Sequence, residues 1–67
     1  MIVYLNNQQV AIDENCSLLA LLESKEITAK SGIAVAVNNV VINSSKWQSK
    51  ILSENDKILV ISATKGG

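Results

Sequence analysis

The fold is decided by the last ten residues, from Ile58 to Gly67, whose sequence is ILVISATKGG. The apolar part, Ile58 to Ile61, predicts a β-strand, because β-branched side chains fit the pleated surface of a sheet. The residues from Ala63 onward offer nothing to pack into a core. We therefore expect a folded domain over residues 1–63 and a flexible C-terminal tail over residues 64–67.

The tail ends in two of the three glycines of the chain, Gly66 and Gly67. Because glycine has no Cβ, such an end is thin enough to enter a narrow channel and to bring a carboxylate close to other backbone. The terminal carboxylate of Gly67 is therefore the candidate reactive group. The alternative interpretation is a tail without function, since chain ends are often disordered.

Size and composition exclude several classes of protein. A chain of 67 residues forms one small domain, in which a deep catalytic cleft is not expected. Six basic and six acidic side chains cancel without a basic cluster, so no site for nucleic acid or for an anionic membrane surface is indicated. The apolar runs are too short to span a membrane, and the N-terminus lacks the charged region of a signal peptide. We expect a cytoplasmic protein.

The chain has few groups for catalysis of its own. It contains no histidine, which removes the usual base of nucleophilic pairs and the commonest metal ligand. Cys16 is the only cysteine, so no internal disulfide is possible, and we expect it to be a small buried residue near a helix start. The acidic pairs Asp13-Glu14 and Glu54-Asp56 fall in predicted turns and are interpreted as structural. The sequence thus predicts a protein that is not an enzyme and that binds neither a metal nor a cofactor.

The first half of the chain predicts a hairpin followed by a helix. Residues Met1 to Leu5 and Gln8 to Asp13 are the expected strands, joined by Asn6-Asn7, because asparagine tolerates the positive φ of a tight hairpin turn. Ser17 is the expected helix N-cap. The helix continues to Lys25 and carries leucines at helical spacing, which predict one face buried against a sheet: Leu18, Leu19, Leu21 and Leu22.

The second half predicts another hairpin. After a loop over Glu26 to Gly32, large and small apolar residues alternate from Ile33 to Val37, as expected of a central strand. Asn38-Asn39 is again a turn signal, and Val40 to Ile42 is the returning strand.

Two short elements connect this hairpin to the final strand. A single helical turn over Lys46 to Gln48, capped by Asn43-Ser44-Ser45, contains Trp47, which we interpret as a packing residue, with a binding role as the alternative. A tight turn over Ser53 to Asp56 precedes the last strand. The order predicts an α+β fold in which one mixed sheet of about five strands packs on one helix, with the first and last strands parallel in its middle.

The order of elements and the terminal diglycine resemble the ubiquitin-like β-grasp family and, more narrowly, the ThiS family of sulfur carriers in thiamin biosynthesis. The similar features run nearly end to end: the helix start from Ser17 to Glu23, the hairpin from Ile33 to Val41, Lys46-Trp47, the turn and strand from Asn55 to Leu59, and Gly66-Gly67.

The resemblance implies a carrier cycle. A ThiF-like, E1-like enzyme would use ATP to adenylate Gly67, sulfur from a donor such as a cysteine desulfurase would replace the adenylate, and a ThiG-like thiazole synthase would take the sulfur from the thiocarboxylate. Gly66 would provide clearance. Lys65 departs from the small apolar residue often found before this diglycine and is expected to be a solvated spacer or to pair with an acidic channel wall.

Alternation along the final strand also predicts a partner surface. Ile58 and Val60 should face one way and Leu59 and Ile61 the other, while only one face meets the helix. By the same resemblance we expect Leu59 and Ile61 to face partners; coverage by loops is the alternative. Two other functions stay open at this point: a carrier like the small subunit of molybdopterin synthase, and a ubiquitin-like modifier or binding module.

Overall fold

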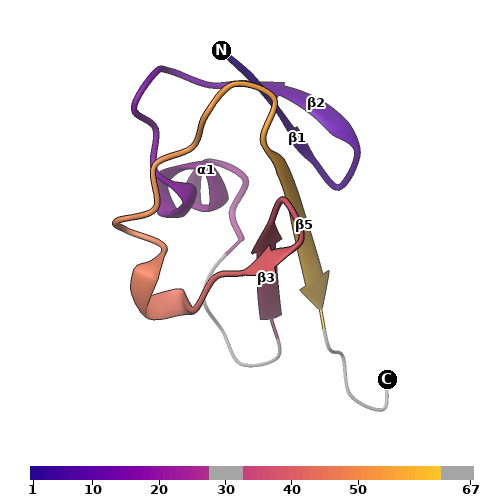
Figure 1. The fold of residues 1–67 in the computed structure, drawn as a ribbon, viewed down its shortest axis with the longest axis vertical. Coiled ribbons are helices and arrows are strands. Elements are labelled where there is room, and N and C mark those ends of the chain that lie inside the picture. Colours follow the sequence, from indigo (N-terminus) through magenta and orange to yellow (C-terminus); the bar gives the residue numbers. More distant parts are fainter. Residues whose placement is uncertain (28–32, 63–67) are drawn as a thin grey trace.

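The computed structural model describes residues 1–27 and 33–62. Its elements follow the predicted order (Figure 1). They are β1 (Ile2–Leu5), β2 (Gln8–Ala11), α1 (Leu18–Ser24), β3 (Ile33–Val37), β4 (Val40–Val41), a 3₁₀ helix (Ser44–Lys46) and β5 (Lys57–Ser62). The predicted α+β class, with one mixed sheet, one helix and a short helical turn, is confirmed.

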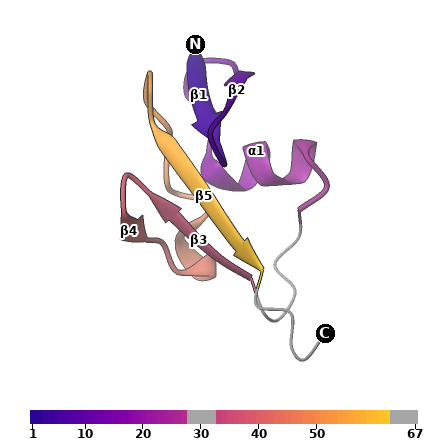
Figure 2. The same cartoon turned by 90° about the vertical axis from the view of Figure 1, so that its right-hand side faces the viewer.

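The sheet has the strand order β2-β1-β5-β3-β4. β1 runs parallel to β5, with Tyr4 opposite Lys57 and Leu5 opposite Ile58. β3 runs antiparallel to β5 along the range from Ile58 to Ser62. The first and last strands therefore lie side by side in the interior of the sheet, as predicted, and α1 covers one sheet face (Figure 2).

Both hairpins turn on an asparagine pair. The φ angles are 48° and 69° at Asn6 and Asn7, and 51° and 71° at Asn38 and Asn39. A two-residue hairpin turn of this kind needs positive φ at both central positions, where the amide side chain of asparagine lowers the steric cost. Asn55, in the turn before β5, also has a positive φ of 69°. The turns predicted from asparagine are confirmed.

Three strands are shorter than predicted, and the first of them, β1, begins at Ile2 and not at Met1. β2 ends at Ala11, although Ile12 still exchanges two hydrogen bonds of 2.8 Å with the N-terminal residue Met1. β4 ends at Val41 because the next carbonyl, that of Ile42, turns to accept a bond from an indole nitrogen. The bond to Trp47, five positions further along the chain, thus coincides with the end of β4.

The helix is short and depends on burial of its leucines. Its N-cap is Ser17, as predicted, and the Ser17 hydroxyl accepts a bond from the backbone N–H of Ala20 at 3.0 Å. Seven residues are too few for a stable isolated helix, so packing must hold it. Leu19 is only partly buried; the core consists of Val3, Leu18, Leu21, Leu22, Val35, Val37, Trp47, Leu52 and Ile58.

Trp47 packs in this core and is 2% exposed. Its indole N–H donates to the carbonyl of Ile42 at 2.9 Å, and its own carbonyl accepts from the backbone N–H of Leu19 at 3.1 Å. Trp47 therefore connects the end of β4, through its side chain, to the helix start, through its backbone. Its predicted packing role is confirmed.

Asp56 fixes the position where β5 begins. Its side chain is largely buried and accepts two bonds, from the amide of Asn38 at 2.9 Å and from the backbone N–H of Ser53 at 2.8 Å. Glu54 accepts a bond from the backbone N–H of Ile2 at 3.1 Å. The structural interpretation of this acidic pair is thereby confirmed.

We expect Asp56→Ala to lower the free energy of unfolding by about 3 kcal/mol, because two donors lose a charged acceptor in a buried position. Glu54→Ala is the matched control, since it removes one exposed bond of an acidic residue in the same turn, and it should cost about 1 kcal/mol or less. Urea unfolding of both variants measures the difference. Equal losses would contradict the role given to Asp56.

The second prediction concerns Asn39, whose φ is 71° and whose side chain is exposed. Asn39→Ala should lower the free energy of unfolding by about 1 kcal/mol, because a Cβ without an amide is unfavourable at positive φ. Asn39→Gly should be neutral or stabilising. Thermal unfolding of the two variants tests the backbone explanation, which is wrong if alanine is tolerated as well as glycine.

Candidate functional site

The strand that leads to the predicted reactive group is anchored within the sheet. Gly67, Gly66 and Lys65 themselves lie outside the described residues, which end at Ser62. Before that point β5 pairs with β3 over the range from Ile58 to Ser62 and with β1 at its start. The C-terminal end of β5 lies at the end of the molecule away from the N-terminus (Figure 1). The chain thus approaches its last residues from a fixed position.

The outward residues of β5 are those predicted. Leu59 and Ile61 are 47% and 51% exposed, whereas Ile58 is 2% exposed and Val60 is partly buried. Leu59 and Ile61 therefore occupy the sheet face that α1 does not cover. A contact between these two side chains and a partner stays a prediction.

Further apolar residues lie beside them on the same sheet face. Ala36 of β3 is paired with Leu59 on one side and with Val41 on the other, and Ala34 is paired with Ile61. Side chains of paired residues share a sheet face, so Ala36 lies between Leu59 and Val41, and Ala34 lies beside Ile61. Val41 is 70% exposed and Ala36 only 8%. We call Ala34, Ala36, Val41, Leu59 and Ile61 the alanine patch.

Sequence reasoning did not identify the alanine patch. The signal was present in the alternation from Ile33 to Val37, which places the alanines on the face opposite the large residues. The neighbours of the alanines, however, follow from the register of three strands, and that register joins residues far apart in the chain.

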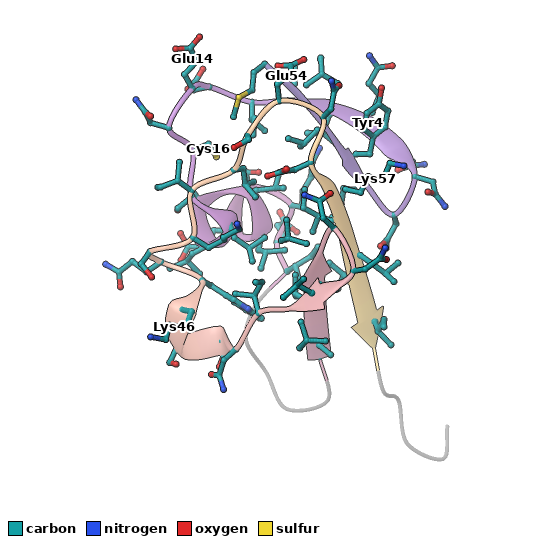
Figure 3. The ribbon with its side chains drawn as sticks, in the orientation of Figure 1. Tyr4, Glu14, Cys16, Lys46, Glu54 and Lys57 are labelled. Carbon is teal, nitrogen blue, oxygen red and sulfur yellow. The ribbon has the colours of Figure 1, made fainter. Side chains whose placement is uncertain are left out.

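A polar recess adjoins the alanine patch where β5 begins. Tyr4 and Lys57 are opposite each other in the parallel pair, and Figure 3 shows both on the side of the sheet away from α1. Lys57 is the only charged residue in the five strands. Both asparagine turns contribute to the recess, whose lining is Tyr4, Asn6, Asn7, Asn39, Lys57, Ile58 and Leu59. This end of the face combines one positive charge with neutral hydrogen-bonding groups.

A second hollow lies between the end of β2 and α1. Its lining includes Cys16, which was predicted to be buried; the side chain packs against the core but is only partly buried, because the hollow opens beside it. The thiol donates to the carbonyl of Ser17 at 3.4 Å. The chain has no imidazole to activate this sulfur.

The described residues show no other centre for chemistry. Within residues 1–27 and 33–62, no three cysteine or acidic side chains gather closely enough to hold a metal ion. In the same part of the chain, no helix has the length and apolar character needed to cross a membrane.

Comparisons with known proteins identify the family. The model of the ThiS family matches residues 3–67, a range that includes both terminal glycines. No curated protein matches the chain. Among solved structures, the thiamine biosynthesis protein (ThiS) from Geobacter metallireducens is similar over 100% of both chains, with a TM-score of 0.82 and 17% identity, which supports the same fold. The chain therefore belongs to the ThiS family, the non-catalytic sulfur carriers of thiamine biosynthesis.

Proposed function

We propose that the carboxylate of Gly67 is the group that carries sulfur, as a thiocarboxylate, to the enzyme that forms the thiazole ring of thiamin in the cytoplasm. The observation that carries the proposal is the family match, because it extends through Gly66 and Gly67. The position of β5 supports it, because a central strand leads directly toward these residues.

The proposed cycle has four steps. The Gly67 carboxylate first bonds to the α-phosphorus of ATP on an E1-like, ThiF-like adenylating enzyme, and pyrophosphate leaves. The terminal sulfur of a persulfide, supplied by a cysteine desulfurase, then attacks the acyl carbon, and AMP leaves. A thiol reductant cleaves the acyl disulfide that results, which leaves the thiocarboxylate on Gly67 and a disulfide on the donor side. A ThiG-like thiazole synthase finally accepts the sulfur. The first step is needed because a free carboxylate is a poor electrophile until it bears a good leaving group.

The composition of the carrier suits this division of labour. The partners provide the catalytic groups, so the absence of histidine from the chain is no obstacle. Gly66 would allow the backbone to pass through a narrow channel that any Cβ would obstruct. Lys65 would act as a solvated spacer or would pair with an acidic group on the wall of that channel.

The partner surface in this proposal is the alanine patch. Leu59, Ile61 and Val41 are large apolar side chains that remain about half exposed or more. Exposed apolar side chains that are contiguous, as opposed to scattered, are typical of protein-binding surfaces. Lys57 beside them favours a partner surface that bears a complementary acidic group.

Deleting Gly67 should abolish sulfur transfer to the carrier. We expect the wild-type protein, incubated with the adenylating enzyme, ATP and a sulfur donor, to show by intact-mass measurement the exchange of one oxygen for sulfur. The deletion variant should show no exchange, and its thermal unfolding should match the wild type, because every residue of the core cluster precedes the tail.

Three results would contradict this part of the proposal. A truncated protein that still gains sulfur would exclude Gly67 as the attachment site. A wild-type protein joined to a lysine by an amide bond would indicate a modifier. A wild-type protein of unchanged mass would indicate a binding module.

Leu59→Ser should weaken binding to the adenylating enzyme by about tenfold, because a buried apolar contact at the centre of an interface is lost. Ile51→Ser is the matched control: Ile51 is 48% exposed, close to the value for Leu59, but it lies outside the sheet and forms an isolated bridge with Ser17. Titration calorimetry measures both affinities. Equal effects of the two substitutions would refute a specific role for the alanine patch.

A further inference from the structure

β5 has a strand neighbour on both sides only at its beginning. β1 pairs with it at Lys57 and Ile58, whereas β3 pairs with it from Ile58 through Ser62. Figure 2 shows β5 continuing well past the end of β1. Within the part of the chain that the structure describes, the later half of β5 is thus paired along one edge.

The hydrogen bonds show which backbone groups face the other edge. The N–H of Asn6 donates to the carbonyl of Ile58 at 2.8 Å, and the N–H of Val60 donates to the side-chain carbonyl of Asn6 at 2.8 Å. Each residue of a strand directs its N–H and its carbonyl to the same edge, and every second residue faces the same edge. The carbonyl of Val60 and both backbone groups of Ser62 therefore face the side from which β1 has turned away. We call these groups the open edge of β5.

Asn6 determines where the open edge begins. Its φ of 48° turns β1 into the hairpin, and its side chain then takes the place of the next backbone acceptor of a neighbouring strand. Lys57, the one charged residue of β5, lies at the opposite end of the strand. The open edge consequently lacks the charges and prolines that usually prevent strand pairing.

We infer that the adenylating enzyme adds an extended segment of its own chain to the open edge and forms main-chain hydrogen bonds with Val60 and Ser62. Addition of a strand to an exposed edge is a common mode of peptide recognition. The enzyme must hold the chain near Gly67, and five extended residues span at most about 17 Å, so a segment paired with Ser62 lies within reach of the reacting group. This inference rests on the proposed function.

The side chains next to the open edge fit the same partner. Leu59 and Ile61 alternate with Val60 and point to the sheet face that α1 does not cover. A segment that pairs with the edge therefore brings the rest of the enzyme over the alanine patch. Backbone pairing would fix the position of the carrier on the enzyme, while the apolar contacts would supply area.

Ser62→Pro tests the inference because it removes one N–H of the open edge. That N–H is not used by β3: the carbonyl of Lys57 bonds to the β3 side, so odd-numbered residues face β3 and Ser62 faces away from it. Proline is tolerated where a strand edge needs no donor. Ser62→Ala is the matched control, since it keeps the N–H.

We expect Ser62→Ala to bind the adenylating enzyme like the wild type and Ser62→Pro to bind about tenfold more weakly, with the unfolding temperatures of both close to that of the wild type. Hydrogen exchange of the wild-type Ser62 amide should slow by at least about tenfold on complex formation. If the proline variant is unfolded, the exchange measurement alone decides.

The inference is overturned if the proline and alanine variants bind equally and the Ser62 amide stays unprotected. Weaker binding of the proline variant without protection overturns it as well, because proline would then act by redirecting the chain. In both cases the wild-type carrier still binds and gains sulfur, so the proposed function stands. A wild-type carrier that neither binds nor gains sulfur overturns both.

Discussion

The position of β5 depends on the group of hydrogen bonds around Asp56. The carbonyl of Asp56 accepts from Tyr4 of β1 at 2.9 Å, and its carboxylate accepts from Asn38 in the turn between β3 and β4. The Asn38 side chain in turn accepts from the backbone N–H of Lys57, the first residue of β5, at 3.0 Å. β1 is thus bonded to Asp56, and the turn that follows β3 is bonded to both Asp56 and Lys57, where β5 starts. Within residues 1–27 and 33–62 the core cluster has nine buried side chains, and so small a core leaves these bonds a large part in defining that start.

The parts of the fold that follow from local chemistry could be predicted from the sequence. Ser17 caps the helix through a bond to a residue three positions away, and the two asparagine pairs need only the positive φ of their own turns. The bonds that complete the fold join distant residues. Asn38 and Asp56 are 18 positions apart, and Asn6 and Val60 are 54 apart. No local pattern shows that Asn6 and Asn38, which form turns, also accept bonds from β5, because those partners follow from tertiary position.

The site could be predicted in part for the same reason. Alternation along β5 separated Leu59 and Ile61 from Ile58 and Val60, and the exposed fractions agree with that separation. The alanine patch could not be derived in this way, since its residues come together only when three strands are paired in register. Cys16 was predicted to be buried from the general behaviour of free cysteine, but the open hollow beside it depends on how β2 and α1 meet. The roles of Lys65, Gly66 and Gly67 still rest on their sequence and on the family.

The three surfaces of β5 are coupled through a single register. Ile58 is buried in the core, its neighbour Leu59 points outward, and Val60 and Ser62 direct their backbone groups to the open edge. A slip of one residue would exchange the core face for the outward face and would also reverse the edge to which each backbone group points. The burial of Ile58 and the bonds to Asp56 oppose such a slip. A carrier without catalytic groups contributes mainly by positioning, so the interactions that determine this register also determine how the protein can meet its partners.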